Sequence, residues 1–366
     1  MGLVMQWSSE RLRAARVMVV GCGALGNEVM KNLVLMGVGQ LVLVDFDYVE
    51  PSNLSRSILY RRSDIGKRKV DVAKRALQQL NPNLRVETIF GDVAYEVGLG
   101  VFRRMDVVVG CVDSRWARYC IQRLCLRAGK SWVDGGILDL EGTMRVFRPG
   151  ENCYACCLGE QGLEELRRRM PCSGVIRRQE EAHHAPTTPL IASVIGAVQA
   201  QEAIKVIVGS EPSRRMFYYE GEHLTARTVD FQAWDEDCPL HEAWEPLGNL
   251  LTAEGDRLAV RQEMKVGTLV AHGALLLNDP FVDYVIHKER GVRTSLMLPA
   301  HRVAAGIESH PDLCFEPFSR FDQHAYRVID GDFPYPELTL GELGIPAEDV
   351  LRMKTKCGTQ YIAMVC

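Results

Sequence analysis

Short apolar runs alternate with stretches of helical periodicity along the first part of the chain. Val17–Val20 is an apolar, largely β-branched run and Leu41–Val44 is a second apolar run, and both favour buried strands. A helical pattern opens between them, at Asn27. From Lys69 to Leu80 apolar residues recur at helical spacing, and Asn81-Pro82 would end that helix. Strands that alternate with helices predict a parallel sheet.

The same alternation continues to about residue 231. The further predicted elements are a leading helix at Ser8–Ala15, strands at Arg85–Val93, Asp106–Ser114, Ser131–Asp134 and Thr143–Phe147, helices at Arg115–Ala128 and Leu190–Val208, and a final hairpin of Phe217–Glu220 and Ala226–Phe231. We therefore expect an α/β fold with a doubly wound, mostly parallel, Rossmann-like sheet.

The length of the chain predicts a second domain. A chain of 366 residues exceeds one typical hydrophobic core, so the first domain would span residues 1–244. Residues 245–366, where the pattern changes, would form a smaller α+β domain. Near its end, Leu338–Leu343 predicts a short helical turn, and Asp349–Lys354 and Thr359–Val365 predict two strands.

A glycine motif follows the first predicted strand. Gly21, Gly23 and Gly26 have G-x-G-x-x-G spacing, and such a turn lets the backbone approach a phosphate at the N-terminus of the next helix. Asp45 ends the second strand about twenty residues later, where a carboxylate can accept hydrogen bonds from ribose hydroxyls. These residues predict a nucleotide site without identifying the nucleotide. The alternative is a tight turn with a purely structural role.

Polar residues past the second strand extend this site. Asn53, Arg56 and Lys69 lie beyond the carboxyl end of that strand, where open α/β sheets bind ligands. We assign Asp47, two residues after Asp45, to the same nucleotide site. A solvated basic surface is the simpler interpretation of four neighbouring residues, Arg61, Arg62, Lys67 and Arg68.

Asp113 ends the fourth predicted strand and would face the same crevice. A carboxylate there could hold a magnesium ion that bridges phosphates. Alternatively, Asp113 or Ser114 caps the helix that begins at Arg115, and both roles are compatible.

Two short cysteine-containing motifs predict a metal site. Cys153-x-x-Cys156 and Cys238-x-x-His241 together offer four ligands of the kind that form a closed, tetrahedral zinc site. Because the motifs are roughly eighty residues apart, the zinc would join the end of the first domain to its middle and play no catalytic part. The alternative is a set of unrelated buried cysteines.

Composition narrows the class of protein. The formal charge is −4 with both signs interspersed, which predicts no nucleic-acid partner. No apolar run looks long enough to cross a bilayer, and the N-terminus lacks the apolar core of a signal peptide. Twelve cysteines without a secretory signal predict reduced thiols and a cytoplasmic location.

With these residues in hand, positions 12 to about 241 resemble the ThiF/MoeB superfamily (ThiF/MoeB/HesA) of ubiquitin-like-protein activating enzymes. The segments that carry the resemblance run in order along the chain: GCGALG, LVDFDYVEPSNLSR, GKRKV, GCVDS, CYAC, PLIASVIGAVQAQEAIK and CPLH. The resemblance implies that Asp45 binds ribose, that Asn53, Arg56 and Lys69 hold and polarise a triphosphate, and that Asp113 orients magnesium. It also suggests a symmetric homodimer.

The basic residues favour ATP over a dinucleotide. A dehydrogenase needs no Arg, Lys and Asp around a triphosphate, whereas attack on an α-phosphate needs its charge neutralised and the leaving pyrophosphate stabilised. The nucleophile would be the C-terminal carboxylate of a small β-grasp protein, which is ionised at neutral pH and needs no general base. The product would be an acyl-adenylate.

Residues 157–189 correspond to the crossover loop of the family. Cys172 lies roughly where family members carry a reactive cysteine, and the neighbouring arginines would lower the pKa of its thiol. The resemblance therefore implies a thioester on Cys172. Cys157 is a competing candidate, and a cysteine without a role is a third interpretation.

The end of the chain has a resemblance of its own. PELTLGELGIPAEDVLRMKTKCGTQYIAMVC resembles the ubiquitin-fold domain that closes eukaryotic activating enzymes, with a β-grasp as one option for its fold. This implies a docking platform for a conjugating enzyme. Two alternatives stay open: a sulfur-carrier adenylyltransferase that forms no thioester, and a non-catalytic subunit or scaffold.

Overall fold

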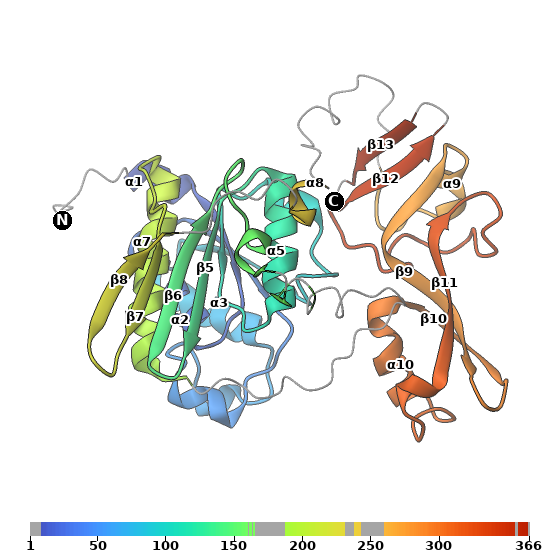
Figure 1. The fold of residues 1–366 in the computed structure, drawn as a ribbon, viewed down its shortest axis with the longest axis horizontal. Coiled ribbons are helices and arrows are strands. Elements are labelled where there is room, and N and C mark those ends of the chain that lie inside the picture. The colour runs from blue at the N-terminus through green and yellow to red at the C-terminus, as the bar shows by residue number, and fades with distance from the viewer. Residues whose placement is uncertain are drawn as a thin grey trace. The chain divides into compact units, whose positions relative to one another are not determined.

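The chain folds into two compact units (Figure 1). The computed structural model describes residues 9–159, 161–162, 164, 187–230, 238–242, 260–355 and 358–364. Unit 1 comprises residues 1–94, 102–160 and 183–245, and unit 2 comprises residues 95–101, 161–182 and 246–366. The predicted boundary between residues 244 and 245 lies outside the described residues and stays a prediction.

Unit 1 contains an eight-stranded sheet with the order β3-β2-β1-β4-β5-β6-β7-β8. Its strands are β1 (Arg16–Val20), β2 (Gln40–Asp45), β3 (Arg85–Phe90), β4 (Val107–Gly110), β5 (Trp132–Leu138), β6 (Glu141–Phe147), β7 (Met216–Glu220) and β8 (Thr225–Val229). Neighbouring strands from β3 to β5 are parallel, and those from β5 to β8 are antiparallel. The expected mostly parallel α/β fold is therefore confirmed, with an antiparallel extension at one edge.

Helices cover both faces of this sheet (Figure 1). The helices of unit 1 are α1 (Ser9–Ala14), α2 (Ala24–Leu35), α3 (Lys69–Leu80), α5 (Arg115–Ala128), α7 (Pro189–Val208) and the short α8 (Pro239–Glu242). A further short helix, α4 (Leu99–Arg103), begins in residues that belong to unit 2. In the sheet, β2 and β3 follow on one side of β1, and β4 and β5 follow on its other side. Because the crossover connections between parallel strands are right-handed, α5 lies on the face of the sheet opposite to α2 and α3. Helix α7 packs against α2 and lies on the same face of the sheet as α2 and α3.

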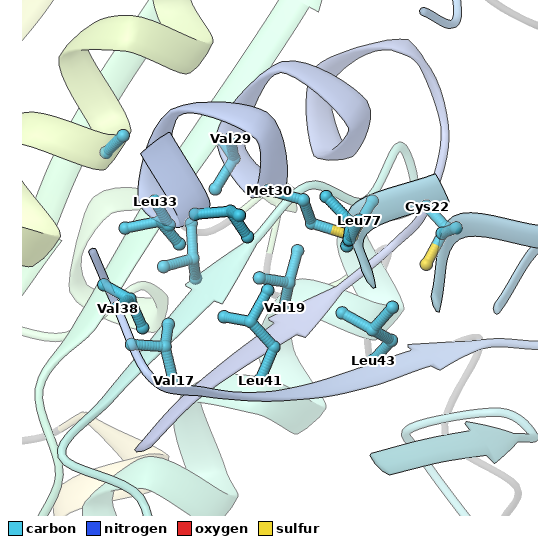
Figure 2. Close-up of a cluster of buried hydrophobic side chains, with 14 of the residues drawn as sticks. Val17, Val19, Cys22, Val29, Met30, Leu33, Val38, Leu41, Leu43 and Leu77 are labelled. Carbon is cyan, nitrogen blue, oxygen red and sulfur yellow. The ribbon is translucent and has the colours of Figure 1, made fainter. Parts of the chain in front are cut away.

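The apolar runs identified in the sequence form the core of unit 1. Figure 2 shows side chains of β1 and β2, such as Val19 and Leu41, packed beneath Met30 and Leu33 of α2. All four are at most 1% exposed. Both sheet faces are covered, which explains why these strands are continuously apolar instead of alternating.

Two sequence-based expectations need correction in unit 1. Helix α2 begins at Ala24, not at Asn27, because the glycine turn leads directly into its first turn. The expectation that no apolar run is long enough to cross a membrane is also wrong. Pro189–Val208 has the required length and composition, yet half of this stretch is buried, against α2 and β4–β6, as in the core helix of a globular unit.

Unit 2 is built around one long strand, β9 (Ala274–His287). Strands β10 (Arg293–Pro299), β11 (Phe321–Ile329) and β12 (Val350–Thr355) each pair with β9, and β13 (Gly358–Ala363) pairs with β12. Helices α9 (Val266–Val270) and α10 (Val303–Ser309) complete the described part, which agrees with the expected α+β class. Every described strand pair here is antiparallel, so the parallel central pair of a β-grasp is not among them.

Residues 95–101 depart from the sequence-based domain assignment, because they cluster with unit 2. Leu99 N donates to Asp349 Oδ1 at 3.0 Å and Gly100 N to Glu348 O at 2.8 Å. A Cβ on Gly98 would lie 2.3 Å from Ala347 O, so only glycine permits this close approach. Neither periodicity nor composition could reveal such a long-range fit.

Candidate functional site: a cavity at the carboxyl ends of the parallel strands

The site lies where the strand order of unit 1 reverses. Strands β2 and β4 flank β1 on opposite sides, so the connections after β1 and β4 diverge and leave a crevice beyond their carboxyl ends. A cavity of about 560 Å³ opens there, within the usual size range for small-molecule sites. Of the predicted nucleotide-site residues, those lining the cavity are Gly21, Gly23, Asp45, Asp47, Asn53, Arg56, Lys69 and Asp113.

The three motif glycines have different roles. Gly21 has a φ of +95°, and a Cβ on it would lie 2.4 Å from Cys111 O of the β4 turn. A Cβ on Gly26 would lie 2.0 Å from Gly21 O, so Gly26 serves close packing of α2 and does not line the cavity. A Cβ on Gly23 would meet no atom within 4 Å. Gly23 therefore leaves open space at the N-terminus of α2, where an anion is favoured.

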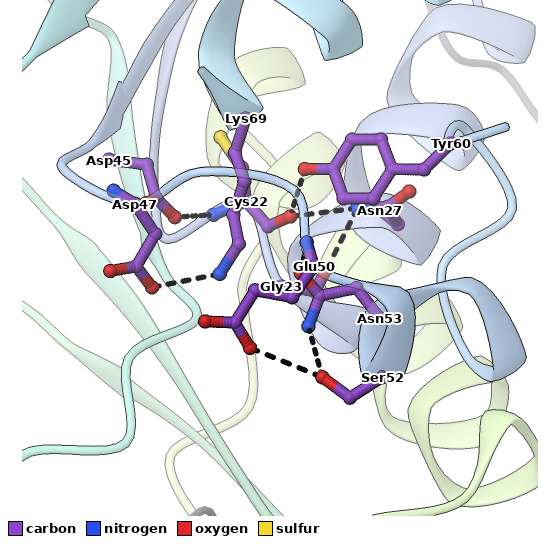
Figure 3. Close-up of polar contacts among 10 residues, drawn as sticks. All are labelled: Cys22, Gly23, Asn27, Asp45, Asp47, Glu50, Ser52, Asn53, Tyr60 and Lys69. Atoms are coloured by element: carbon purple, nitrogen blue, oxygen red, sulfur yellow. Dashed lines mark hydrogen bonds and ion pairs between the residues drawn. The ribbon is translucent and has the colours of Figure 1, made fainter. Parts of the chain in front are cut away.

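Asp45 is held rigidly at the end of β2. Its carboxylate accepts hydrogen bonds from Cys22 N at 2.6 Å and from Asp47 N at 2.7 Å (Figure 3). Burial raises the pKa of Asp45, and the charge of Lys69 opposes this increase. Each oxygen retains a lone pair after these bonds, so the carboxylate can still accept from a ligand hydroxyl.

Lys69 brings a positive charge to the same wall. It begins α3, its side chain is 9% exposed, and Nζ forms a 2.8 Å ion pair with Asp47 Oδ2 (Figure 3). Burial alone would lower the pKa of Lys69, but Asp45 and Asp47 raise it above its usual value. The ammonium is therefore charged at neutral pH and faces the cavity.

The loop after β2 positions Asn53 and Arg56. Asn53 is buried, and its Oδ1 accepts from Glu50 N at 3.0 Å (Figure 3). Arg56 is half-buried and donates from one guanidinium nitrogen to Ser52 O at 3.0 Å. A guanidinium offers five N–H groups, so several stay available to an anionic ligand.

Sequence analysis missed two residues that fix the glycine turn. Asn27 Nδ2 donates to Cys22 O at 2.8 Å and its Oδ1 accepts from Leu59 N at 2.9 Å, which joins the turn to the loop after β2. Tyr60 donates its hydroxyl proton to the same Cys22 carbonyl (Figure 3). Asn27 is fully buried, and a polar residue within an apolar helical pattern was the available signal.

Ser114, not Asp113, is the N-cap of α5. Its hydroxyl accepts from Ala117 N at 3.2 Å, which satisfies one of the free amides of the first helical turn. The carboxylate of Asp113 is exposed and lines the cavity. The structure thus decides between the two candidate caps and leaves Asp113 available as an oxygen ligand for magnesium.

A second pair, Arg118 and Asp134, was also missed by sequence analysis. Both line the cavity, and Arg118 Nε lies 3.0 Å from Asp134 Oδ1. Burial alone would lower the pKa of Arg118, and Asp134 raises it. An acidic residue within β5 and a basic residue near the beginning of α5 were the only signals in the sequence.

Two described cysteines, Cys111 and Cys157, bear on the question of a reactive thiol. Cys172 lies outside the described residues, so its role stays a prediction. Burial raises the pKa of Cys111, which lines the cavity, and that of Cys157, where Arg145 opposes the increase. Both thiols are thereby disfavoured as thiolates.

The four predicted metal ligands come together in unit 1. Cys153 Sγ lies 3.7 Å from Cys156 Sγ and 3.6 Å from Cys238 Sγ, and Cys156 Sγ lies 3.9 Å from His241 Nε2. All four ligand atoms lie within 4.8 Å of one another. Thiolates at tetrahedral corners about 2.3 Å from zinc would be about 3.8 Å apart, so this geometry fits the ion.

Comparisons with known proteins identify the family of unit 1's sequence. A model of the ThiF family matches residues 2–240. A sulfur carrier protein adenylyltransferase of Thermus thermophilus is 37% identical over 206 residues, which cover 55% of this chain and 72% of that protein. A SAMP-activating enzyme E1 of Haloferax volcanii is 31% identical over 232 residues, which cover 63% of this chain and 81% of that protein.

Other relatives are longer than the matched region. An adenylyltransferase and sulfurtransferase MOCS3 of Culex quinquefasciatus is 32% identical over 231 residues, and this match spans 50% of that protein and 62% of this chain. Among solved structures, E. coli MccB with ATP has a TM-score of 0.51 at 23% identity, over 63% of this chain and 68% of that chain. This last likeness concerns the fold alone.

Proposed function

Because this chain belongs to the ThiF family, we propose that it uses ATP to adenylate the C-terminal carboxylate of a small ubiquitin-like or sulfur-carrier β-grasp protein. The observation that carries this proposal is the convergence of Lys69, Arg56 and Asn53 on one cavity with an ordered Asp45. The names of the relatives, which are adenylyltransferases and an activating enzyme E1, support the same chemistry.

In the proposed reaction, Asp45 binds the ribose and the other residues of the site bind the triphosphate. The Asp45 carboxylate accepts from ribose hydroxyls, and the triphosphate lies against Gly23 and the positively charged end of α2. Lys69 and Arg56 neutralise phosphate charge, with Asn53 as a neutral donor. Magnesium, held by Asp113, would supply further positive charge to the phosphate oxygens.

The bond changes of the proposed step balance without a general base. An oxygen of the carrier's carboxylate forms a bond to the α-phosphorus, and the bond from that phosphorus to the bridging oxygen breaks. Pyrophosphate leaves with the electron pair, and the carrier is left as an acyl-adenylate. Positioning and cationic charge supply the catalysis, because the nucleophile is already ionised.

We further propose that the Cys172 thiolate attacks the acyl carbon of the adenylate, so that a thioester forms and AMP leaves with the electron pair of the broken acyl–oxygen bond. The carrier then passes to a thiol of a conjugating enzyme that docks on unit 2, and the Cys172 thiolate is released. The name of the Haloferax relative favours this route, and residues 246–366 of unit 2, which lie outside the matched family region, are a candidate platform. The second candidate function is sulfur-carrier adenylation without a thioester, which the name of the Thermus relative favours. A homodimer, a structural zinc and a cytoplasmic location complete the proposal.

A non-reducing gel separates the two candidate functions. The protein is incubated with ATP, magnesium and a purified β-grasp carrier, and the wild type is compared with Cys172→Ala. We expect an ATP-dependent, thiol-sensitive adduct that is absent from the variant. Pyrophosphate exchange without any adduct would favour sulfur-carrier adenylation, and absence of both would contradict adenylation itself.

A further inference from the structure

An ion pair joins the N-terminal part of α5 to Asp134 of β5. Arg118 Nε lies 3.0 Å from Asp134 Oδ1, and the two side chains are 14% and 8% exposed. A second guanidinium nitrogen donates to Gly135 O at 3.1 Å. Arg118 therefore holds two successive residues of β5, in a fixed planar geometry that a flexible ammonium would not reproduce.

The part of β5 that Arg118 contacts is also fixed from the other face of the sheet. Gln199 of α7 is fully buried, and its Nε2 donates to Gly110 O at 2.9 Å and to Val133 O at 3.3 Å. A Cβ on Gly135 would lie 2.3 Å from Gln199 Oε1, so the contact is tight. The end of β4 and the part of β5 paired with it thus form a rigid base against which Arg118 can locate α5.

The part of α5 located in this way carries Asp113. Ser114 caps the helix, and Asp113 immediately precedes this cap. A third nitrogen of Arg118 lies 3.5 Å from Asp113 O, a weak contact that points in the same direction. The position of the Asp113 carboxylate at the cavity therefore depends on where the α5 N-terminus is held.

We propose that Arg118 is a positioning residue which, through Asp134, places Asp113 and so sets the affinity of the nucleotide site for Mg²⁺. The inference rests on the proposed function, because it assumes that the cavity binds ATP with magnesium at Asp113. Residues that orient a metal ligand typically change metal affinity by about 10–100-fold when substituted.

The test is calorimetric titration of ATP into the full chain at a series of free Mg²⁺ concentrations. The main variant replaces both partners, R118M with D134N, so that neither leaves an unpaired buried charge. We expect it to raise the half-saturating Mg²⁺ concentration by about tenfold or more. The affinity for ATP at saturating Mg²⁺ should stay within about twofold of the wild type, which is about 0.4 kcal/mol.

Two further variants sharpen the comparison. Arg118→Lys retains the charge and should restore part of the Mg²⁺ affinity. Arg127→Met makes the same loss of charge on α5 at a position that does not line the cavity, and should leave the Mg²⁺ dependence unchanged. Amide hydrogen exchange of residues 114–118 without any ligand should be faster in the double variant, since the helix end is no longer anchored.

Three outcomes would overturn the inference. The first is an unchanged Mg²⁺ dependence in the folded double variant. The second is an equal loss of ATP affinity at every Mg²⁺ concentration, which would indicate direct contact of Arg118 with the nucleotide. The third is unchanged amide exchange in the double variant. Failure of the wild type to bind ATP would instead contradict the proposed function. Amide exchange would then still decide whether Arg118 positions the helix end.

Discussion

Lys69 is the residue on which the proposed chemistry depends most directly. Its charged side chain reaches the cavity only because Asp45 and Asp47 offset the cost of burial. The ion pair with Asp47 also holds the ammonium group in a position from which it can contact a phosphate. A ligand phosphate would compete with Asp47 for the three donors of Lys69.

We predict that Lys69→Met lowers the rate of ATP–pyrophosphate exchange by about 100-fold or more, because one preorganised cationic donor to the developing charge is lost. The measurement is exchange of labelled pyrophosphate in the presence of a carrier protein. Lys74→Met, on the same helix but outside the cavity lining, is the matched control and should retain full activity. Equal activity of the two variants would show that the phosphate assignment is wrong.

The glycine turn shows how an element can combine a packing role with a binding role. Gly26 approaches the backbone of Gly21, whereas Gly23 faces open space. We predict that Gly26→Ala lowers the free energy of unfolding by about 1–3 kcal/mol, because the backbone must shift to accept a methyl group. Gly23→Ala should leave unfolding nearly unchanged and weaken ATP binding.

Denaturant unfolding and equilibrium ATP binding, measured on both glycine variants, test this prediction. The expected result is a crossed pattern in which stability falls for one variant and affinity for the other. If Gly23→Ala bound ATP as the wild type does, the ligand would not approach the N-terminus of α2.

The N-cap of α5, Ser114, is a second local feature of a secondary-structure element whose contribution can be measured. We predict that Ser114→Ala lowers the free energy of unfolding by about 1 kcal/mol, since the Ala117 amide loses its acceptor. Chemical denaturation measures this effect. Ser63→Ala, at an exposed position of unit 1, is the control and should change stability by less than about 0.5 kcal/mol.

At the scale of the whole molecule, the Cys/His cluster joins distant parts of unit 1. Cys153 and Cys238 are 85 positions apart in the sequence and their sulfur atoms lie 3.6 Å apart. We predict one zinc per chain by elemental analysis, and loss of both zinc and thermal stability in Cys238→Ser. Cys314→Ser, an exposed position in unit 2, should retain the metal. Freshly purified wild type without zinc would refute the site.

Unit 2 contains a buried histidine that couples its stability to pH. His301 Nδ1 lies 2.6 Å from Asp279 Oδ2, its Nε2 lies 3.8 Å from Glu96 Oε1, and its ring stacks on Tyr95. Glu96 also pairs with Arg302. Burial alone would lower the pKa of His301, but Asp279 and Glu96 raise it above its ordinary value of 6.5.

Because the folded-state pKa of His301 is raised, its stabilising contribution is complete below pH 6.5 and is lost as the pH rises through the folded-state pKa. We predict that the melting temperature of unit 2 falls across this window in the wild type and falls less in His301→Gln. Calorimetric scans at stepped pH values test this, with the exposed His272→Gln as control. Identical pH dependence in wild type and His301→Gln would contradict the prediction.

The sequence by itself determined the family, the parallel core and most of the polar residues that line the cavity. These features depend on local signals: apolar runs, helical spacing, glycines in a turn, and polar residues that directly follow strands. Strand ends meet at one edge of a parallel sheet, so Asp45 and Asp113 could be placed near each other without coordinates. The family assignment is confirmed by the match over residues 2–240.

Only the tertiary structure decided which residues support that site. Arg118 of α5 contacts Asp134 of β5, and Gln199 of α7 contacts β4 and β5 from the opposite face of the sheet. The long strand β9 and the inclusion of residues 95–101 in unit 2 were likewise invisible, because they depend on contacts between residues far apart in sequence. Local patterns specify elements and their ends, whereas side-chain partners across elements are set by packing in three dimensions.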